Sequence, residues 1–542
     1  MVGRTKGRMI STVLLFLALA PSVRGQSSHL NEMSLERWGK LREVERHQMQ
    51  VAEKYFRDRN WTVAADEYEK YMTLYESSNA ASHALLKWAM CQVEMRHQNT
   101  AIDDGFRSVV DYWPDSEDAI AASFYVGKTL QDIGQTKKAK VALKEVADQH
   151  AKHLAGVHAM VSLAQIATIE NDEQAIVENL RKLTFQATRD KLTRRQCETA
   201  SIQLAAHLFG NSQSSDAIEA LATTYQLDRL ANEVVNQSRT ALRTFTSDPK
   251  STAKSAALAD ELIAYLREQE PESIETEQTK GFAKNLCYLV IDVQQTAKRN
   301  DQVLAEFSNI AKRFGSDDEL LGRIANWYQA NGQYEKAREN YKKFADKIVG
   351  LTLIADSYRQ EKNLTHAIQT YAKLIAADSE NQSKWKALSA TTYREFEKYA
   401  EAITLYQQLM QEDTTNGDRW LWETATTHRE AGDWRAAIGF FRQSERFPDS
   451  YREMASCHRH LKQHSEAVTL YNQIAGGDKA AAPWAMLQIG YTEEEAKRKD
   501  QAIAAFKKVC KLFPKDQNAS RAHAHLQNQY KLTVTLGGSK QD

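Results

Sequence analysis

A repeat of about 35 residues runs through most of the 542-residue chain and constrains the fold more than any other feature. In the second half, one set of alanines recurs at intervals of 30, 35, 35, 30 and 35 residues. These alanines are Ala337, Ala367, Ala402, Ala437, Ala467 and Ala502. A less regular version of the spacing continues through the first half. Such a period predicts a stack of small supersecondary units rather than a string of independent domains.

Each unit has the residue pattern of two helices that cross closely. A small residue is followed by an aromatic or apolar residue three positions later, as in Ala325 and Tyr328. An alanine follows nine positions further on, and another aromatic or apolar residue four positions after it, as in Ala337 and Tyr341. Small residues allow two helices to approach, and the aromatic rings fill the space between neighbouring pairs. One such hairpin cannot bury both of its faces, so the hairpins must stack. The predicted crossing residues are Ala325, Ala337, Ala390, Ala402, Ala425 and Ala437.

The composition predicts helix throughout. The chain has only 22 Gly and 7 Pro, and no Pro-, Gly- or Ser-rich linker divides it. Its hydrophobic fraction of 42% is ample for a packed protein and excludes global disorder. We therefore expect an all-α fold.

The repeated pattern resembles the tetratricopeptide repeat, whose period is about 34 residues. The resemblance covers about residues 45–530. It implies a right-handed α–α superhelix of about 11–13 helix–turn–helix repeats that binds a protein or peptide along a concave groove. Phrases such as Phe447-Pro-Asp-Ser450 are similar to repeats of periplasmic envelope proteins of bacteria. The resemblance therefore indicates an exported scaffold for cell-envelope assembly or organisation.

The first 25 residues have the pattern of a secretory signal peptide. A basic start at Arg4, Lys6 and Arg8 precedes an apolar run, Ile10 to Ala20, and small residues precede Gln26. The run is too short to span a bilayer comfortably, and no later segment approaches about 20 uninterrupted apolar residues. We expect cleavage before Gln26 and a periplasmic or secreted chain without an integral membrane span.

The repeat frame predicts how the remaining chain is divided. It is interrupted around Asp248-Pro249 and Glu270-Pro271, which indicates an atypical helical pair and a hinge. The expected segments are an N-terminal repeat array at 26–227, the atypical segment at 228–285, a C-terminal array at 286–518, a capping helix at 519–532 and a flexible tail at 533–542.

One column of the repeat alignment carries the predicted partner-binding site. Successive repeats place Arg359, Arg394, Arg429 and Arg459 directly after the aromatic position of the first helix. The resemblance implies that this position faces the concave groove, where the four guanidinium groups would meet carboxylates of an extended acidic segment. Alternatively, the arginines pair internally with Asp356, Glu395 and Glu430 and hold the repeats in register.

Other kinds of site find less support in the sequence. The repeats leave no stretch long enough for a catalytic domain, so we expect a non-enzymatic protein without cofactor or metal. Cys457, His458, His460 and His464 are too few free ligands for zinc, since His458 fills an aromatic core position. Without residues 1–25 the chain has 67 basic and 71 acidic residues, a net charge of −4, which does not indicate nucleic acid.

Two alternative functions remain open. The chain could be an accessory subunit that recruits an envelope enzyme, such as a peptidoglycan synthase or hydrolase. It could instead bind envelope glycans through exposed aromatic rings, for which Trp420, Trp422 and Trp484 are the candidates.

Overall fold

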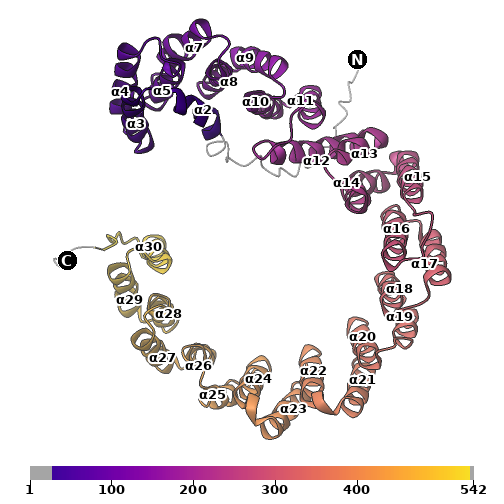
Figure 1. Cartoon of the computed structure of the whole chain (residues 1–542). Helices are drawn as coiled ribbons and strands as arrows, with labels where there is room; N and C mark the ends of the chain where they lie inside the picture. Colours follow the sequence, from indigo (N-terminus) through magenta and orange to yellow (C-terminus); the bar gives the residue numbers. More distant parts are fainter. Residues whose placement is uncertain (1–26, 538–542) are drawn as a thin grey trace, which may run out of the picture. The chain divides into compact units, whose positions relative to one another are not determined.

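The structure, a computed structural model, describes residues 27–537, which contain helices and no strand. The expected all-α fold is therefore confirmed for these residues. The predicted signal peptide and residues 538–542 of the predicted tail lie outside them. The described residues divide between Phe314 and Gly315 into two compact units, called unit 1 and unit 2 here, and Figure 1 labels their helices.

Unit 1 begins with two short elements and continues as paired helices. Its elements are η1 (Ser27–Asn31), α2 (Leu35–Lys40), α3 (Glu43–Arg57), α4 (Trp61–Leu74), α5 (Ala81–Glu94), α6 (Gln98–Thr100), the π-helix η2 (Ala101–Phe106), α7 (Arg107–Tyr112), α8 (Glu117–Asp132), α9 (Thr136–Gln149), α10 (Leu154–Glu170), α11 (Glu173–Phe185), α12 (Arg194–Gly210), α13 (Ser214–Ala222), α14 (Leu227–Ser247), η3 (Pro249–Ser251), α15 (Thr252–Glu268), α16 (Glu277–Thr296) and α17 (Asn300–Phe314).

Unit 2 is a regular series of helical hairpins closed by a single helix. Its elements are α18 (Asp318–Ala330), α19 (Tyr334–Tyr341), α20 (Lys347–Gln360), α21 (Leu364–Ala377), η4 (Ser379–Asn381), α22 (Gln382–Glu395), α23 (Tyr399–Glu412), η5 (Thr414–Asn416), α24 (Gly417–Glu430), α25 (Trp434–Phe441), α26 (Asp449–His460), α27 (His464–Gly477), α28 (Ala482–Glu495), α29 (Lys499–Leu512) and α30 (Gln517–Tyr530).

Each helix packs mainly against the next one along the chain, so that hairpins stack on hairpins within each unit. We call the first helix of a hairpin its A helix and the second its B helix. In unit 2 the A helices are α18, α20, α22, α24, α26 and α28, and Figure 1 shows them along one side of the stack, with the B helices along the other. In unit 1 the A helices include α3, α5, α8, α10 and α12.

Small residues lie where the A and B helices cross. The six alanines of the predicted crossings, Ala325, Ala337, Ala390, Ala402, Ala425 and Ala437, have no exposed surface. Gly490 in α28 occupies the equivalent place, and a methyl group added there would lie 2.3 Å from the ring of Phe506 in α29. Because packed interiors have little free volume, such positions tolerate no larger side chain without a shift of the helices.

A second repeated device joins successive hairpins of unit 2. Asp378 and Asp413 end α21 and α23, and each accepts a hydrogen bond from the indole of a tryptophan seven residues later. The Trp385 Nε1 to Asp378 Oδ2 distance is 3.0 Å, and that from Trp420 Nε1 to Asp413 Oδ2 is 3.1 Å. A buried indole needs such an acceptor, so the aspartate fixes the start of the next A helix.

The segment expected to be atypical contains long helices. α14 has 21 residues and contacts α12, α15 and α16, and Pro249 begins the short turn η3 just after it. The boundary between the compact units falls later, between Phe314 and Gly315. The hinge at 228–285 stays a prediction. The helix that closes unit 2, where the sequence predicts a capping helix at 519–532, is α30.

Candidate protein-interaction site

The four predicted arginines lie on consecutive A helices of unit 2. Arg359 is near the end of α20, Arg394 of α22, Arg429 of α24 and Arg459 of α26. Each follows the partly buried aromatic or histidine side chain that packs between the helices of its own hairpin. The arginines are therefore carried by rigid helices rather than by loops, one per repeat.

Every arginine of the column pairs with a carboxylate of the next A helix. The Arg359 Nη2 to Glu395 Oε1 distance is 2.7 Å, and the Arg394 Nη1 to Glu423 Oε2 distance is 2.6 Å. Arg429 pairs with Glu453, and Arg459 Nη2 lies 2.5 Å from Glu495 Oε1.

Additional carboxylates complete this row of charges. Asp356 lies 2.9 Å from Arg359, within the same helix, and Glu430 lies 3.6 Å from Arg394. The row, which we call the arginine row, thus has four arginines and six carboxylates, a formal charge of 4 − 6 = −2. Its members are Arg359, Arg394, Arg429, Arg459, Asp356, Glu395, Glu423, Glu430, Glu453 and Glu495.

The row is half-buried and its charges are strongly coupled. The arginine side chains are 20–31% exposed. Burial alone would lower the pKa of Arg359, but the hydrogen bonds that it donates to Glu395 raise this pKa above its ordinary value. The Arg459 guanidinium holds the pKa of Glu495 below its usual range, chiefly through their hydrogen bond. The geometry therefore matches the internal pairing that the sequence left open as the alternative to partner binding.

The column ends in a different kind of contact. Glu494 stands where the next arginine would be, and it accepts hydrogen bonds from His525 Nε2 at 2.9 Å and Tyr530 Oη at 2.7 Å. Both donors belong to α30. The glutamate at this position of the repeat thus attaches α30 to the last hairpin.

The aromatic residues proposed for glycan binding pack inside the repeats. Trp420 is only 3% exposed, so the expectation of an exposed ring there is wrong. Trp422 is half-buried edge-on against Phe441, and Trp484 against Tyr471, with ring centroids 5.0 and 5.6 Å apart. Trp422 thus packs on the B helix of its own hairpin, and Trp484 on the B helix of the preceding one.

The histidine cluster of α26 is also occupied by packing. His460 stacks on Trp434 with ring centroids 4.1 Å apart, and His458 Nδ1 lies 2.8 Å from the Gln463 side-chain oxygen. Cys457 is fully buried. Within residues 27–537, no group of three or more His, Cys, Asp or Glu side chains is arranged to hold a metal ion.

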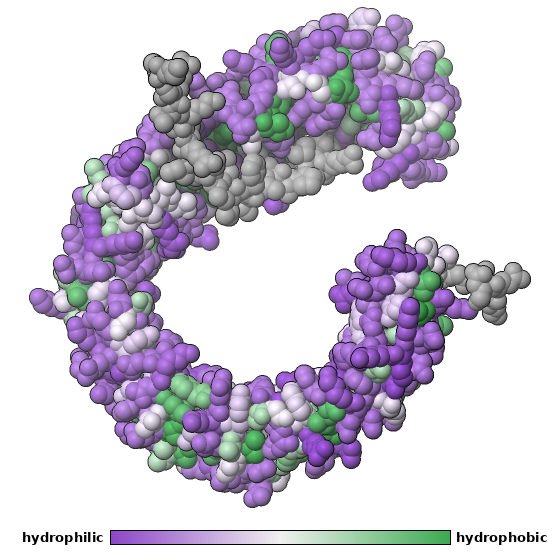
Figure 2. All heavy atoms as spheres, turned by 180° about the vertical axis from the view of Figure 1, so that it is seen from behind, coloured by the Kyte–Doolittle hydropathy of each residue, from purple (hydrophilic) through white to green (hydrophobic). Residues whose placement is uncertain are grey.

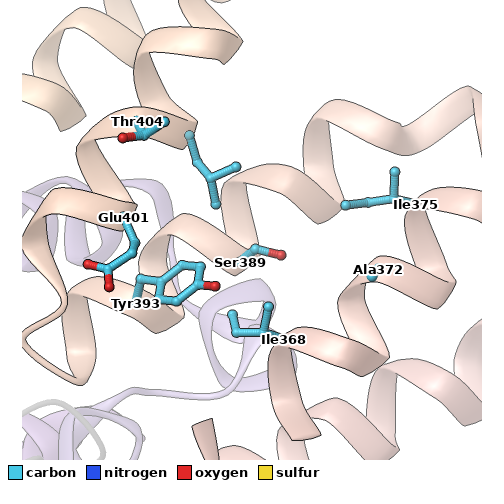
Figure 3. A pocket seen from close by; sticks show the side chains of 8 residues that line it. Ile368, Ala372, Ile375, Ser389, Tyr393, Glu401 and Thr404 are labelled. Atoms are coloured by element: carbon cyan, nitrogen blue, oxygen red, sulfur yellow. The ribbon is translucent and has the colours of Figure 1, made fainter. Parts of the chain in front are cut away.

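An open pocket of about 320 Å³ lies between α21, α22 and α23 (Figure 3). Its wall is mainly apolar, with one carboxylate at its edge, and includes none of the four arginines. The lining residues are Ile368, Ala372, Ile375, Ser389, Tyr393, Glu401, Thr404 and Leu405. Elsewhere the visible face of unit 2 is mostly hydrophilic with separate apolar patches (Figure 2).

A buried charged cluster in unit 1 was not predicted from the sequence. His83 and Lys87 of α5 are 1% and 3% exposed, and Asp118 of α8 is 4% exposed. Glu53 of α3 lies 3.2 Å from Lys87 Nζ and accepts a 2.8 Å hydrogen bond from Tyr68. The residues are up to 65 positions apart in sequence, so no local motif marks them; charged residues at core positions of the repeat were the available signal.

Stacked antiparallel helix pairs with small residues at their crossings define the class of α-helical repeat proteins. Models of the tetratricopeptide repeat match the chain at residues 83–116, 350–381 and 484–516. These spans correspond to the hairpins at α5–α7, α20–α21 and α28–α29. The chain is a tetratricopeptide repeat protein, as the residue pattern indicated, and this fold is that of a protein-interaction scaffold.

Several solved structures are similar to the chain at low sequence identity and low TM-score. The APC/C hetero-tetramer Cut9-Hcn1 is 13% identical, with 91% of this chain and 99% of that chain covered and a TM-score of 0.26. Yeast Tom70 is 12% identical, with 84% and 96% covered and a TM-score of 0.25. pilF of Pseudomonas aeruginosa is 18% identical, with 38% of this chain and 97% of that chain covered and a TM-score of 0.25. A comparison with curated proteins gives no match.

Proposed function

We propose that the chain is a non-enzymatic scaffold that binds a protein or peptide partner along the A helices of unit 2. The observation that carries this proposal is the arginine row, which places ten charged side chains on the A helices of five consecutive hairpins. The arginines of the row are 20–31% exposed, and ion pairs that water reaches contribute only about 0.2–1 kcal/mol each to stability. Folding alone therefore gives little reason for so long a row of charges.

The charge balance of the row favours a basic partner segment over the acidic one expected from the arginine column. An acidic segment would have to displace the carboxylates that already pair with Arg359, Arg394, Arg429 and Arg459. A segment with lysine or arginine side chains would instead use the free oxygens and the excess negative charge of the row.

Two matched double substitutions test this proposal. Arg394→Ala with Arg429→Ala and Glu423→Gln with Glu453→Gln both break the Arg394–Glu423 and Arg429–Glu453 ion pairs, so both should destabilise the protein by roughly 1–2 kcal/mol. The arginine variant also loses the longer, weaker pair of Arg394 with Glu430. They change the charge of the row in opposite directions. We expect the glutamate variant to recover at least tenfold less partner in pull-downs from native extracts, and the arginine variant to retain it.

Two other results of these pull-downs would contradict a basic partner segment. Loss of the partner from the arginine variant alone would show that the segment is acidic, as the column predicted. Retention by both variants, with their thermal unfolding shifted equally, would make the arginine row a purely structural feature and overturn the proposal.

We further propose that the scaffold is exported and acts in the cell envelope. The basic and apolar pattern of residues 1–25 supports this. No helix within residues 27–537 is long and apolar enough to cross a membrane. N-terminal sequencing of the chain from its native source decides between export, which leaves Gln26 as the first residue, and retention of the leader.

A role as recruiting subunit of an envelope enzyme is compatible with the same surface. Affinity purification from the envelope fraction distinguishes the two: a set of assembly proteins supports the scaffold, and one stoichiometric enzyme supports the recruiting subunit.

A further inference from the structure

The segment that precedes the first hairpin of unit 1 lies on the A helices like a bound peptide. Its 3₁₀ turn η1 packs against α5, α8 and α10, and Leu30 is 8% exposed within the apolar core that these helices share. Met33 is 7% exposed and joins the core of the first hairpin. Figure 1 shows α2 beside α5 and α8.

One arginine anchors the segment through a buried carboxylate. The Arg37 Nη2 to Asp118 Oδ2 distance is 2.8 Å, and the same nitrogen donates to the Asn79 carbonyl at 2.7 Å and the Ser82 hydroxyl at 3.2 Å. The Asp118 side chain is 6% exposed. It also accepts from Ser82 at 2.6 Å and lies 3.3 Å from His83 Nδ1.

The surroundings of Asp118 stabilise the charged form of its carboxyl group. Burial alone would raise its pKa, yet His83 and Arg37 hold that pKa well below the ordinary value. A buried carboxylate that loses a charged hydrogen-bond partner destabilises its surroundings. When Arg37 leaves, another guanidinium or ammonium group would restore the pairing.

The segment itself is weakly held apart from these anchors. None of the six residues of α2 is buried, and Leu35 is 88% exposed. A helix of six residues is far too short to be stable alone in water. Elements with so few buried contacts open at a small fraction of the global unfolding free energy.

We propose that this face of α5, α8 and α10 is a binding site for a partner peptide with the pattern of residues 27–41, two apolar side chains three positions apart and an arginine four positions further on. The chain's own segment occupies the site in the free protein as a tethered competitor, and Asp118 recognises the arginine. The inference concerns unit 1 and does not depend on the arginine row of unit 2.

Tethering decides how strongly the segment competes. A segment joined by a short connection is present at an effective concentration of about millimolar. A partner peptide of equal intrinsic affinity therefore binds the intact chain poorly. It binds much better once the tethered segment is weakened.

The test uses the full chain and a fluorescent synthetic peptide of residues 27–42. Leu30→Asp with Arg37→Glu in the chain removes an apolar anchor and sets a carboxylate against Asp118, which frees the site. We expect the peptide to bind this variant at least tenfold more tightly than the wild type. Arg42→Ala is the matched control, because Arg42 pairs with Glu45 in α3 and not with the site; its affinity should equal that of the wild type.

Two measurements identify the role of Asp118. Adding Asp118→Asn to the freed variant should reduce peptide affinity at least tenfold, and so should Arg37→Glu in the peptide, which cannot affect folding of the chain. Hydrogen exchange should accelerate at residues 35–41 of the freed variant while α5 and α8 keep their protection. Equal affinity of wild type and freed variant, or indifference to Arg37→Glu in the peptide, would overturn the proposal.

Discussion

Glu53→Ala is expected to destabilise the first hairpins of unit 1 by about 3–5 kcal/mol. Glu53 Oε1 lies 3.2 Å from Lys87 Nζ and 3.5 Å from His83 Nε2. Lys87 is 3% exposed and sits over the ring of Phe56, with its Nζ 3.7 Å from the ring centroid. Removal of the carboxylate leaves a buried ammonium without a counter-charge, which costs far more than loss of an exposed pair.

Hydrogen exchange of the α5 amides measures this loss as a free energy of local opening. Glu43→Ala is the control, since Glu43 is exposed in the first turn of α3, the helix that carries Glu53. Its loss should cost less than about 1 kcal/mol. Glu53→Gln with Lys87→Met removes both charges and should recover most of the stability. Equal effects of Glu53→Ala and Glu43→Ala would mean that the cluster is solvated.

The same cluster gives unit 1 a dependence on acid. Burial would raise the pKa of Glu53, but His83, Lys87 and Tyr68 lower it from 4.5 to about 2. A lowered carboxyl pKa contributes stability that is complete above pH 4.5 and is lost as the pH falls through 2. Protection of α5 should therefore fall over this interval in the wild type and change less in the Glu53→Gln, Lys87→Met variant.

Tyr406→Ala is expected to destabilise unit 2 by about 3–5 kcal/mol. The side chain is 1% exposed between α22 and α24, and its ring faces Trp420 with centroids 6.4 Å apart. Its hydroxyl lies 2.9 Å from Thr391 Oγ1. Truncation leaves a cavity at the contact of two hairpins, directly beneath Arg394.

Tyr406→Phe separates the ring from the hydroxyl. It keeps the ring and removes one hydrogen bond, so a loss of about 0.5–1.5 kcal/mol is expected. Thermal unfolding and exchange of the α22–α24 amides measure both variants. A small effect of Tyr406→Ala would mean that the hairpins are not held together at this repeated aromatic position.

The sequence predicts the hairpins well because their signals are local. Ala390, Ala402 and Tyr406 lie within one period, and helix geometry alone brings them to one crossing. Pairing between repeats is less predictable, because it depends on which long side chains reach across. Asp356, Glu395 and Glu430 were named as partners of the arginine column, whereas Glu423 and Glu453 were not.

Features without periodicity were missed. His83 of α5 meets Asp118 only through packing of α5 on α8, and Lys87 of α5 meets Glu53 of α3. Arg37 reaches Asp118 from a helix that belongs to no repeat. Nothing in a repeat alignment marks such contacts. The tryptophan-to-aspartate bonds of Trp385 and Trp420 are periodic, however, and a search for polar residues preceding each buried indole would have found them.

Site-specific photo-crosslinking in cells that produce the chain tests the central claim, that this repeat protein binds its partner along the A helices of unit 2. A photoreactive amino acid replaces Gln360, exposed at the end of α20 beside the arginine row, or Lys373, equally exposed on the B helix α21 of the same hairpin. The account predicts a protein adduct from position 360 that disappears in the Glu423→Gln, Glu453→Gln variant, and none from position 373. Equal adducts from both positions, or an adduct from position 373 alone, would contradict it.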